Sequence, residues 1–176
     1  MDYYMTASNW YKTVPDIYAD GQELLIADVS IDTVLLIDVL EHIPGPDLCL
    51  SEIYRVLKPQ GKLVVHAHFL YPIHDVPLDF HRWTSHGLER ILLKHNLCIT
   101  VLHIDGNTFE TCALLINLAL SNALLWSIKN KNSLLIVAVV ISVFIPLINL
   151  AGFILVRIFP DNSYMPYRYR IIASKT

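Results

Sequence analysis

Charged residues are scarce in this chain of 176 residues: Asp, Glu, Lys and Arg together make up 16% of it, against about 25% in average soluble domains. Hydrophobic residues make up 54%, and the mean hydropathy is +0.46. This composition excludes an intrinsically disordered chain, a collagen and a coiled coil. The length suffices for one domain with a core of its own and short additions.

Glycine and cysteine are also few. The glycines are too widely spaced to form a GxGxxG or P-loop motif; they are Gly21, Gly45, Gly61, Gly87, Gly106 and Gly152. The cysteines, Cys49, Cys98 and Cys112, are odd in number, lack metal-ligand spacing and lie in apolar segments. They predict buried, reduced thiols in a cytosolic protein. Residues 1–12 contain no apolar run, so no secretory signal is expected.

The charges divide the chain in two. Residues 1–106 hold 14 acidic and 7 basic residues, a formal charge of −7, whereas residues 107–176 hold 2 acidic and 6 basic residues, a formal +4. All 8 histidines fall in the first part, and the longest apolar stretches fall in the second. This asymmetry predicts a chemical module joined to a membrane-facing or partner-facing segment. Nucleic acid is not an expected partner, because the acidic part would repel phosphate.

The middle of the first part has the pattern of a strand, a helix and a strand. Thr33–Ile37 is a continuous apolar run, which predicts a strand buried on both faces of a parallel sheet. The apolar stripe over residues 50–57 predicts an amphipathic helix, which Pro59 and Gly61 end. Lys62–Ala67 is again strand-like. The three segments predict a right-handed βαβ unit and an α/β fold.

Further elements are expected on both sides of this unit. Residues 16–20 could form a short strand before a turn at Gly21. Thr84 can cap a helix over residues 85–95, and Leu97–His103 is rich in β-branched and apolar residues, which favours a strand.

Two hydrophobic helices follow. No residue is charged in Thr111–Ile128 or in Ser133–Val156, and the second stretch would be about 36 Å long as a helix, enough for a bilayer core of about 30 Å. Pro146 and Gly152 favour a kink in it. The alternating residues 167–173 predict a final strand.

The βαβ segment carries a family pattern. Residues 32–46 read DxVLLxxVLEHIPxP, and residues 50–61 read LxEIxRVLKPxG. Over residues 2–97 the chain resembles the class I S-adenosylmethionine-dependent methyltransferases of the type 11 group. The resemblance implies a Rossmann-like sheet, here incomplete, with a hydrophobic helical hairpin inserted before the last strand. In the family a first strand, a glycine-rich loop and a helix would precede Asp2, so the resemblance implies an N-terminally truncated product or a mis-called start.

The resemblance also implies cofactor-binding residues. S-adenosylmethionine would bind at the carboxyl ends of the strands. Asp2 would accept hydrogen bonds from the ribose hydroxyls, and Asp20, followed by Gly21 and Gln22, would lie near the adenine amino group. The opposite pocket wall would come from residues 37–42, which include Asp38.

Methyl transfer is an in-line displacement and needs mainly alignment, with a base where the acceptor carries a proton. His42, with Glu41 before it, is the candidate catalytic group beside the acceptor; the alternative is a structural role that caps the loop at the strand end. Residues 69–75 and 77–84 resemble family segments on the acceptor side. They predict four substrate-binding residues, with a loop held by its own Arg and carboxylate bonds as the alternative: His74, Asp79, Arg82 and Trp83.

Two patterns also fit metal ligands. Asp38, Glu41 and His42 form a DxxEH arrangement, which a hydrated helix start explains equally well. His66 and His68 lie on one face of a strand, with His74 and Asp75 soon after. We expect no metal at either pattern.

The hydrophobic pair lies between two strands that are neighbours in the family's sheet, so both of its ends must return to the same side. An even number of passes or a hairpin that dips into one leaflet satisfies this condition. Because a two-pass hairpin would carry Lys129 and Lys131 across the membrane, we expect a shallow or interfacial hairpin on the cytoplasmic face. Its base would hold three arginines near anionic headgroups: Arg157, Arg168 and Arg170. The alternative is a lid or a helical interface between two copies of the chain.

The expected organisation is a methyltransferase-like domain over residues 1–106, a hydrophobic hairpin over residues 107–160, membrane-associated through residues 111–159, and a return strand over residues 161–176. The expected function is methyl transfer to a small or lipid-like acceptor. The alternative is a catalytically inactive chain that binds a membrane or a partner.

Overall fold

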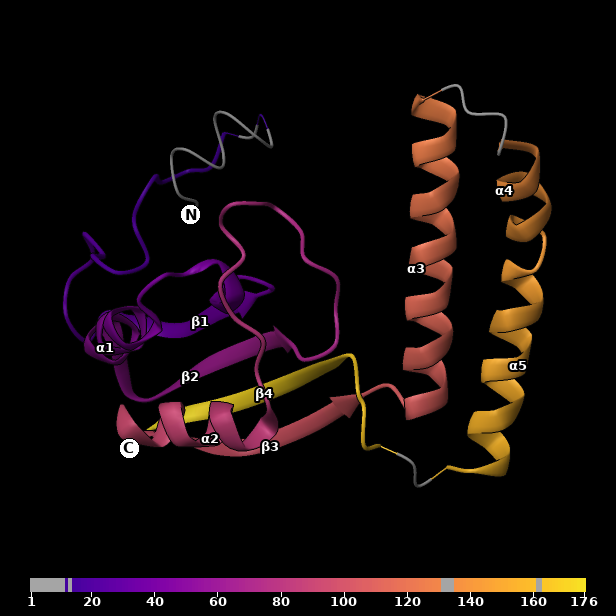
Figure 1. The fold of residues 1–176 in the computed structure, drawn as a ribbon. Helices are drawn as coiled ribbons and strands as arrows, with labels where there is room; N and C mark the ends of the chain where they lie inside the picture. The colour runs from indigo at the N-terminus through magenta and orange to yellow at the C-terminus, as the bar shows by residue number, and fades with distance from the viewer. Residues whose placement is uncertain (1–11, 13, 131–134, 161–162) are drawn as a thin grey trace. The chain divides into compact units, whose positions relative to one another are not determined.

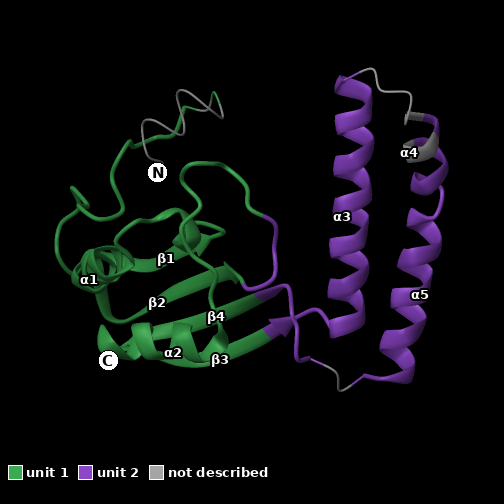
Figure 2. Ribbon diagram, in the orientation of Figure 1, with its two compact units in different colours: residues 1–68, 73–103, 169–176 green, residues 69–72, 104–168 purple. Residues whose placement is uncertain are grey.

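A computed structural model describes residues 12, 14–130, 135–160 and 163–176. The described residues form a mixed α/β fold whose four-stranded sheet has the order β1-β2-β4-β3 (Figure 1). The chain forms two compact units (Figure 2), one of residues 1–68, 73–103 and 169–176 and one of residues 69–72 and 104–168. In chain order the elements of the sheet and its helices are β1 (Ile31–Ile37), the 3-10 helix η2 (Leu40–His42), α1 (Pro46–Val56), β2 (Leu57–His68), α2 (Ser85–Lys94), β3 (Leu97–Asp105) and β4 (Arg168–Lys175).

The βαβ unit has the predicted form. β1 and β2 pair in parallel, with Thr33 opposite Lys62 and Ile37 opposite His66. Helix α1 connects them, starts with proline in its first turn and ends at Val56. Strand β2 begins directly after it, earlier than Pro59 and Gly61 had suggested, because the chain turns at Leu57 into extended backbone.

Helices α1 and α2 lie on the same face of the sheet. Asp47 of α1 accepts hydrogen bonds from Lys94 Nζ and from His95 Nε2, both at 2.8 Å. Beneath them Leu63 and Val65 of β2 are buried.

The expectation that β1 is buried on both faces is wrong for the described residues. Leu36 points to the helix face and is 8% exposed, but Leu35 is 62% exposed and Ile37 is 41% exposed. A continuous apolar run fixes the type of element, whereas burial depends on which other segments cover each face.

The elements on both sides of the βαβ unit agree in part with the predictions from the sequence. Thr84 caps α2, since its side chain accepts a hydrogen bond from Gly87 N. Strand β3 forms where expected and pairs with β4. The predicted strand at residues 16–20 does not form: within the described residues this segment contains only isolated bridge residues, such as Asp20 opposite Glu23.

The apolar segment forms a helical hairpin from α3 (Thr108–Lys129), α4 (Leu135–Ser142) and α5 (Ile145–Ile158). The chain turns at residues 143–144, just before Pro146. The two ends of the hairpin meet, since Asn107 Nδ2 donates to the carbonyl oxygen of Phe159 at 2.8 Å. The hairpin precedes the last strand, as predicted.

The helices of the hairpin pack closely. A Cβ on Gly152 of α5 would lie 3.1 Å from Cβ of Ala113 in α3. Further along, Asn117 Nδ2 donates to Asn149 Oδ1 at 2.6 Å. A polar pair of this kind fixes the register of two otherwise apolar helices.

Candidate functional site

The candidate site lies where β1 and β2 end. Parallel strands end at the same edge of a sheet, and ligands of α/β proteins bind outside that edge. Asp38 follows β1, and its backbone N donates to the carbonyl oxygen of His66 in β2 at 3.3 Å. Helix η2 then carries Glu41 and His42 back over the edge, and β2 ends at His68.

Glu41 is the buried centre of the site. Its side chain is 0% exposed, and its Oε1 lies 2.6 Å from Nδ1 of His68. Burial raises the pKa of this carboxyl, but the hydrogen bond with His68 and the nearby His42 outweigh burial and leave the pKa below its ordinary value. The group is therefore a carboxylate at neutral pH. Its Oε2 is buried and has no hydrogen-bond partner among the described residues.

The ring of His42 is oriented by one hydrogen bond. Its Nδ1 lies 2.7 Å from the carbonyl oxygen of Leu78. A carbonyl can only accept, so Nδ1 carries the hydrogen, and Nε2 is the basic nitrogen of the neutral ring. The ring of His74 stands edge-on to it, with the centroids 4.9 Å apart.

The loop over residues 73–84 closes on this site through an ion pair. Arg82 donates from Nη1 to Oδ1 of Asp79 at 2.5 Å and from Nη2 to Oδ2 at 2.7 Å, and the backbone N of His74 donates to Oδ2 at 2.9 Å. The side chain of Asp79 is only 2% exposed. The Arg82 guanidinium holds the pKa of Asp79 well below its ordinary value.

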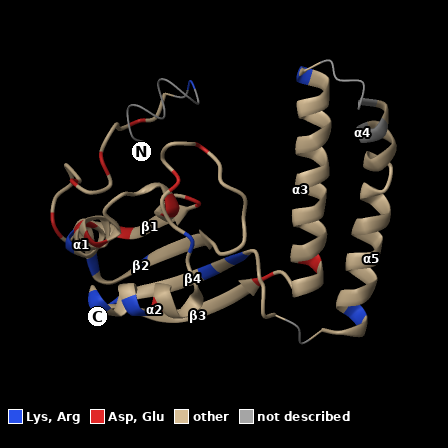
Figure 3. Ribbon diagram, viewed as in Figure 1, with Lys and Arg blue, Asp and Glu red and all other residues tan. Residues whose placement is uncertain are grey.

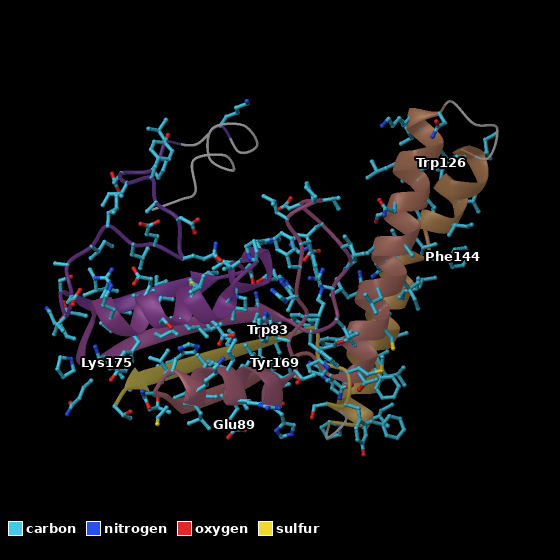
Figure 4. All side chains as sticks on the ribbon, turned by 60° about the vertical axis from the view of Figure 1, so that its left-hand side comes forward. Trp83, Glu89, Trp126, Phe144, Tyr169 and Lys175 are labelled. Atoms are coloured by element: carbon cyan, nitrogen blue, oxygen red, sulfur yellow. The ribbon has the colours of Figure 1, made fainter. Side chains whose placement is uncertain are left out.

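Backbone hydrogen bonds attach the same loop to the strand ends. The carbonyl oxygen of Glu41 accepts from the backbone N of Phe80 at 2.9 Å and of His81 at 3.2 Å. Trp83, labelled in Figure 4, donates its backbone N to the carbonyl oxygen of His68 at 2.9 Å. Its indole Nε1 is buried without a hydrogen-bond partner among the described residues.

The structure describes all of the predicted cofactor-binding residues except Asp2. Asp20 Oδ1 accepts from the backbone N of Gln22 at 2.8 Å and so closes a tight turn. At the tip of this turn, a Cβ on Gly21 would meet the side chains of Ile43 and Cys49 at 3.6 Å. The turn therefore lies against the segment that follows η2. Asp2 lies outside the described residues.

Burial raises the pKa of the neighbouring Cys49 thiol to about 12, with a smaller contribution from the Asp20 carboxylate. This thiol is protonated at neutral pH and is not a nucleophile.

Asp38 stands at the rim of the site in left-handed backbone, with φ 53°. Its Oδ1 is buried without a hydrogen-bond partner among the described residues and lies 3.8 Å from Nδ1 of His68. A strained residue and an unsatisfied carboxylate oxygen at a strand end are features of ligand sites.

Two groups of side chains converge closely enough for the members of each group to contact one ion. Glu41, His42 and His74 each offer an atom within 4.8 Å of the others, and so do Asp38, Glu41 and His68. Neither group matches a metal pattern predicted from the sequence. Each contains Glu41 together with a histidine from a distant segment, His74 in one group and His68 in the other. His68 is the site residue that the predicted set lacked. Its place at the end of a strand parallel to β1 was the available signal.

The chain is similar to known methyltransferases. Residues 3–65 match a family model described as a methyltransferase domain. A sterol 4-C-methyltransferase of Caenorhabditis elegans is 36% identical over 42% of this chain and 22% of its own length. A ubiquinone/menaquinone biosynthesis C-methyltransferase of Brucella anthropi is 32% identical over 43% of this chain and 28% of its own length. The chain thus spans less than a third of these curated relatives.

Solved structures share the fold at low sequence identity. A 1,6-didemethyltoxoflavin-N1-methyltransferase of Burkholderia thailandensis, solved with bound S-adenosylhomocysteine, has a TM-score of 0.53 at 13% identity; the match covers 97% of this chain and 54% of that one. A SAM-dependent methyltransferase of Archaeoglobus fulgidus has a TM-score of 0.51 at 19% identity and is matched over 66% of its length by 90% of this chain.

Proposed function

This chain belongs, through residues 3–65, to the class I S-adenosylmethionine-dependent methyltransferases, and from that premise we propose that it binds S-adenosylmethionine and methylates a small or lipid-like acceptor. The observation that carries the proposal is the cluster of Glu41, His42, His68 and His74 at the carboxyl ends of β1 and β2. This is the edge at which α/β folds bind their ligands.

Four of the described residues would hold the cofactor. The Asp20 carboxylate and the turn at Gly21 and Gln22 would take the adenine, and Asp38 would approach from the end of β1. When bound, S-adenosylmethionine supplies an electrophilic methyl group for in-line displacement. The chain's own contribution is to orient the reactants and exclude water.

On the acceptor side, His42 is the group placed to take a proton. Its Nε2 is basic because Nδ1 donates to Leu78. The carboxylate of Glu41 stabilises the imidazolium that would form, since it lowers the energy of a nearby positive charge. His74, Asp79, Arg82 and Trp83 would line the acceptor, and the loop's internal ion pair keeps them in place. A lipid-like acceptor is supported by the names of the two curated relatives, a sterol methyltransferase and a C-methyltransferase of ubiquinone/menaquinone biosynthesis.

The first test is a calorimetric titration of the 176-residue chain with S-adenosylhomocysteine, which requires the cofactor pocket but no acceptor. We expect micromolar binding that Asp20→Ala weakens at least about tenfold, the usual loss for a hydrogen-bonded charged group. Asp16→Ala, an exposed carboxylate four residues earlier, is the matched control and should bind as the wild type does. No heat at millimolar ligand would contradict the proposal and favour the catalytically inactive binding module.

We also propose that the hairpin associates with a membrane as a shallow or interfacial element on the cytoplasmic face. Within the described residues only 17% of the apolar window of Thr108–Lys129 and 6% of that of Val139–Ile158 are buried, unlike the core helices of a soluble domain. Figure 3 shows charged residues only at the ends of α3 and α5. Because the hairpin's two ends meet through Asn107 and Phe159, the chain enters and leaves on one side.

The arginines near the hairpin's base differ in what they contact. Arg157 stacks over the ring of Phe153 at 3.4 Å, and Arg168 is held by Asp105 at 3.0 Å. Arg157 is therefore the better placed of these two for an anionic headgroup.

Vesicle sedimentation tests the association. Phe144, which Figure 4 labels beside α5, is 52% exposed, and Leu93 on α2 is 49% exposed. We expect Phe144→Asp to release the chain from vesicles of mixed neutral and anionic lipid, because a charge in the acyl region costs about 2.5–3.5 kcal/mol. Leu93→Asp is the control and should sediment as the wild type does. Equal sedimentation of all three, or a wild type that stays in the supernatant, would contradict the membrane proposal.

A further inference from the structure

We propose that Glu41, His42 and His74 bind a divalent transition-metal ion of the zinc type. The proposal concerns the chain's own side chains and does not depend on methyl transfer. It reverses our expectation from the sequence, because the tertiary structure brings together ligands that the sequence spacing kept apart.

The geometry of the three side chains fits one ion. Each offers a ligand atom within 4.8 Å of the other two. Ligands about 2.1 Å from a tetrahedral ion lie about 3.4 Å from one another, so side-chain movements of up to about 1.4 Å bring these atoms onto it. Two imidazoles and one carboxylate form a ligand set typical of zinc and iron sites with open positions.

Glu41 supplies the second observation. Its side chain is 0% exposed, and its Oε2 is buried without a hydrogen-bond partner among the described residues. Burying a charged oxygen without a partner is costly unless a counter-charge satisfies it. The other oxygen, Oε1, is already held by His68 at 2.6 Å. His68 therefore orients the carboxylate and leaves Oε2 for the ion.

In both proposed histidine ligands the second ring nitrogen contacts an oxygen, as it usually does in histidines that bind metals. His42 donates from Nδ1 to the carbonyl oxygen of Leu78 at 2.7 Å, which leaves Nε2 as the coordinating nitrogen. His74 places Nδ1 3.4 Å from Oδ2 of the buried Asp79, so that Nε2 is its ligand atom in the proposed site. A carbonyl or carboxylate on the second nitrogen fixes the tautomer and raises the basicity of a ligating ring.

The surrounding charges favour a cation. The carboxylates of Asp38 and Glu41 are negative, and the charges of Asp79 and Arg82 cancel in their bidentate pair. Magnesium and calcium prefer oxygen ligands, so two imidazoles favour a transition metal instead. Three protein ligands leave positions for water or for an oxygen of the acceptor. An ion held by Nε2 of His42 would keep that nitrogen from taking a proton, so its two proposed roles are alternatives.

The test is a titration of the chelator-treated 176-residue chain with Zn²⁺, read by calorimetry without cofactor or acceptor. Titration with Co²⁺, read by its visible absorption, reports the nitrogen and oxygen ligands directly. We expect one ion per chain, and at least about tenfold weaker binding in His42→Gln and in His74→Gln. His86→Gln is the matched control, because the His86 side chain is 94% exposed and lies outside the cluster. Circular dichroism of the metal-free variants checks that each is folded.

Three results would overturn the proposal. The first is no Zn²⁺ binding at millimolar concentration. The second is binding that His86→Gln weakens as much as His42→Gln does. The third is binding that His68→Gln and Asp38→Asn abolish while His42→Gln and His74→Gln retain it, since the ligands would then be the other group around Glu41. Failure here leaves the S-adenosylhomocysteine titration unaffected, so the two proposals are refuted separately.

Discussion

Asp79 holds the loop over residues 73–84 closed, and Asp79→Asn is expected to open it. The carboxylate accepts two hydrogen bonds from Arg82 and one from the backbone N of His74, at 2.5, 2.7 and 2.9 Å. Asparagine keeps one acceptor oxygen but presents an NH₂ group where the second oxygen was. The substitution therefore removes the negative charge and places the NH₂ group of asparagine opposite an N–H donor.

The size of the effect follows from these bonds. A hydrogen bond to a charged group contributes about 1.5–3 kcal/mol, and breaking a buried ion pair costs about 3–5 kcal/mol. The Arg82 side chain is 25% exposed, so solvent screens part of its charge. We expect the free energy of loop opening to fall by about 3 kcal/mol at pH 7, which is roughly a 150-fold larger open population.

Amide hydrogen exchange, followed by mass spectrometry of the peptide that spans residues 74–83, measures this opening. The amides of Phe80 and His81 donate to Glu41 and exchange only when the loop opens. Asp32→Asn is the matched control. Asp32 pairs with Lys58 at 2.8 Å, but their side chains are 80% and 43% exposed, and an exposed pair contributes at most about 1 kcal/mol.

The dependence on pH has a definite sign. The folded pKa of Asp79 lies below that of an unfolded Asp, because Arg82 stabilises the carboxylate. Its contribution is complete above the unfolded pKa of about 3.9 and is lost as pH falls through the folded pKa. After correction for intrinsic exchange, the ratio between variant and wild type should be largest at pH 7 and roughly tenfold smaller at pH 3. A ratio below about threefold at pH 7, or one that is equal at both pH values, would refute the reasoning.

Three further predictions concern single positions. Burial raises the pKa of Cys49 to about 12, so iodoacetamide at pH 8 should alkylate it about 100-fold more slowly in the native chain than in urea; equal rates would show an accessible thiol. Gly106 has φ 90°, and a Cβ there would lie within van der Waals overlap of the Tyr167 ring, so Gly106→Ala should lower the free energy of unfolding by about 2 kcal/mol in denaturant titration. Gly152→Leu should separate α3 from α5 and destabilise the hairpin by about 1–3 kcal/mol, and an unchanged melting temperature in detergent micelles would contradict the close packing of the two helices.

The local elements could be predicted because their signals are local. Thr84 caps α2, Pro146 follows a break between apolar helices, and the apolar stripe of α1 lies between two strand-like segments. Each of these features depends on residues within a few positions of one another. The short strand at residues 16–20 failed because a strand requires a partner, and no local pattern contains the partner.

The parts of the site whose residues are close together in the sequence could be predicted. Glu41 and His42 follow β1 directly, and Asp79 and Arg82 are three residues apart. The contact of Glu41 with His68 joins positions 27 residues apart, and it requires the parallel pairing of β1 with β2 and the turn of η2. The sequence placed His68 beside His66 on a strand, but it held no information on which loop would fold back over that strand end.

The sequence by itself determined the class of the protein: the βαβ unit, the methyltransferase pattern over its motifs, and a pair of apolar helices before the last strand. Periodicity and capping decide these features, because they act between near neighbours in the chain. Only the tertiary structure decided that one face of β1 is exposed and that His68 and His74, from two other segments, lie beside Glu41. Burial and the convergence of charges depend on strand register and loop closure, which are set by contacts between residues far apart in the sequence.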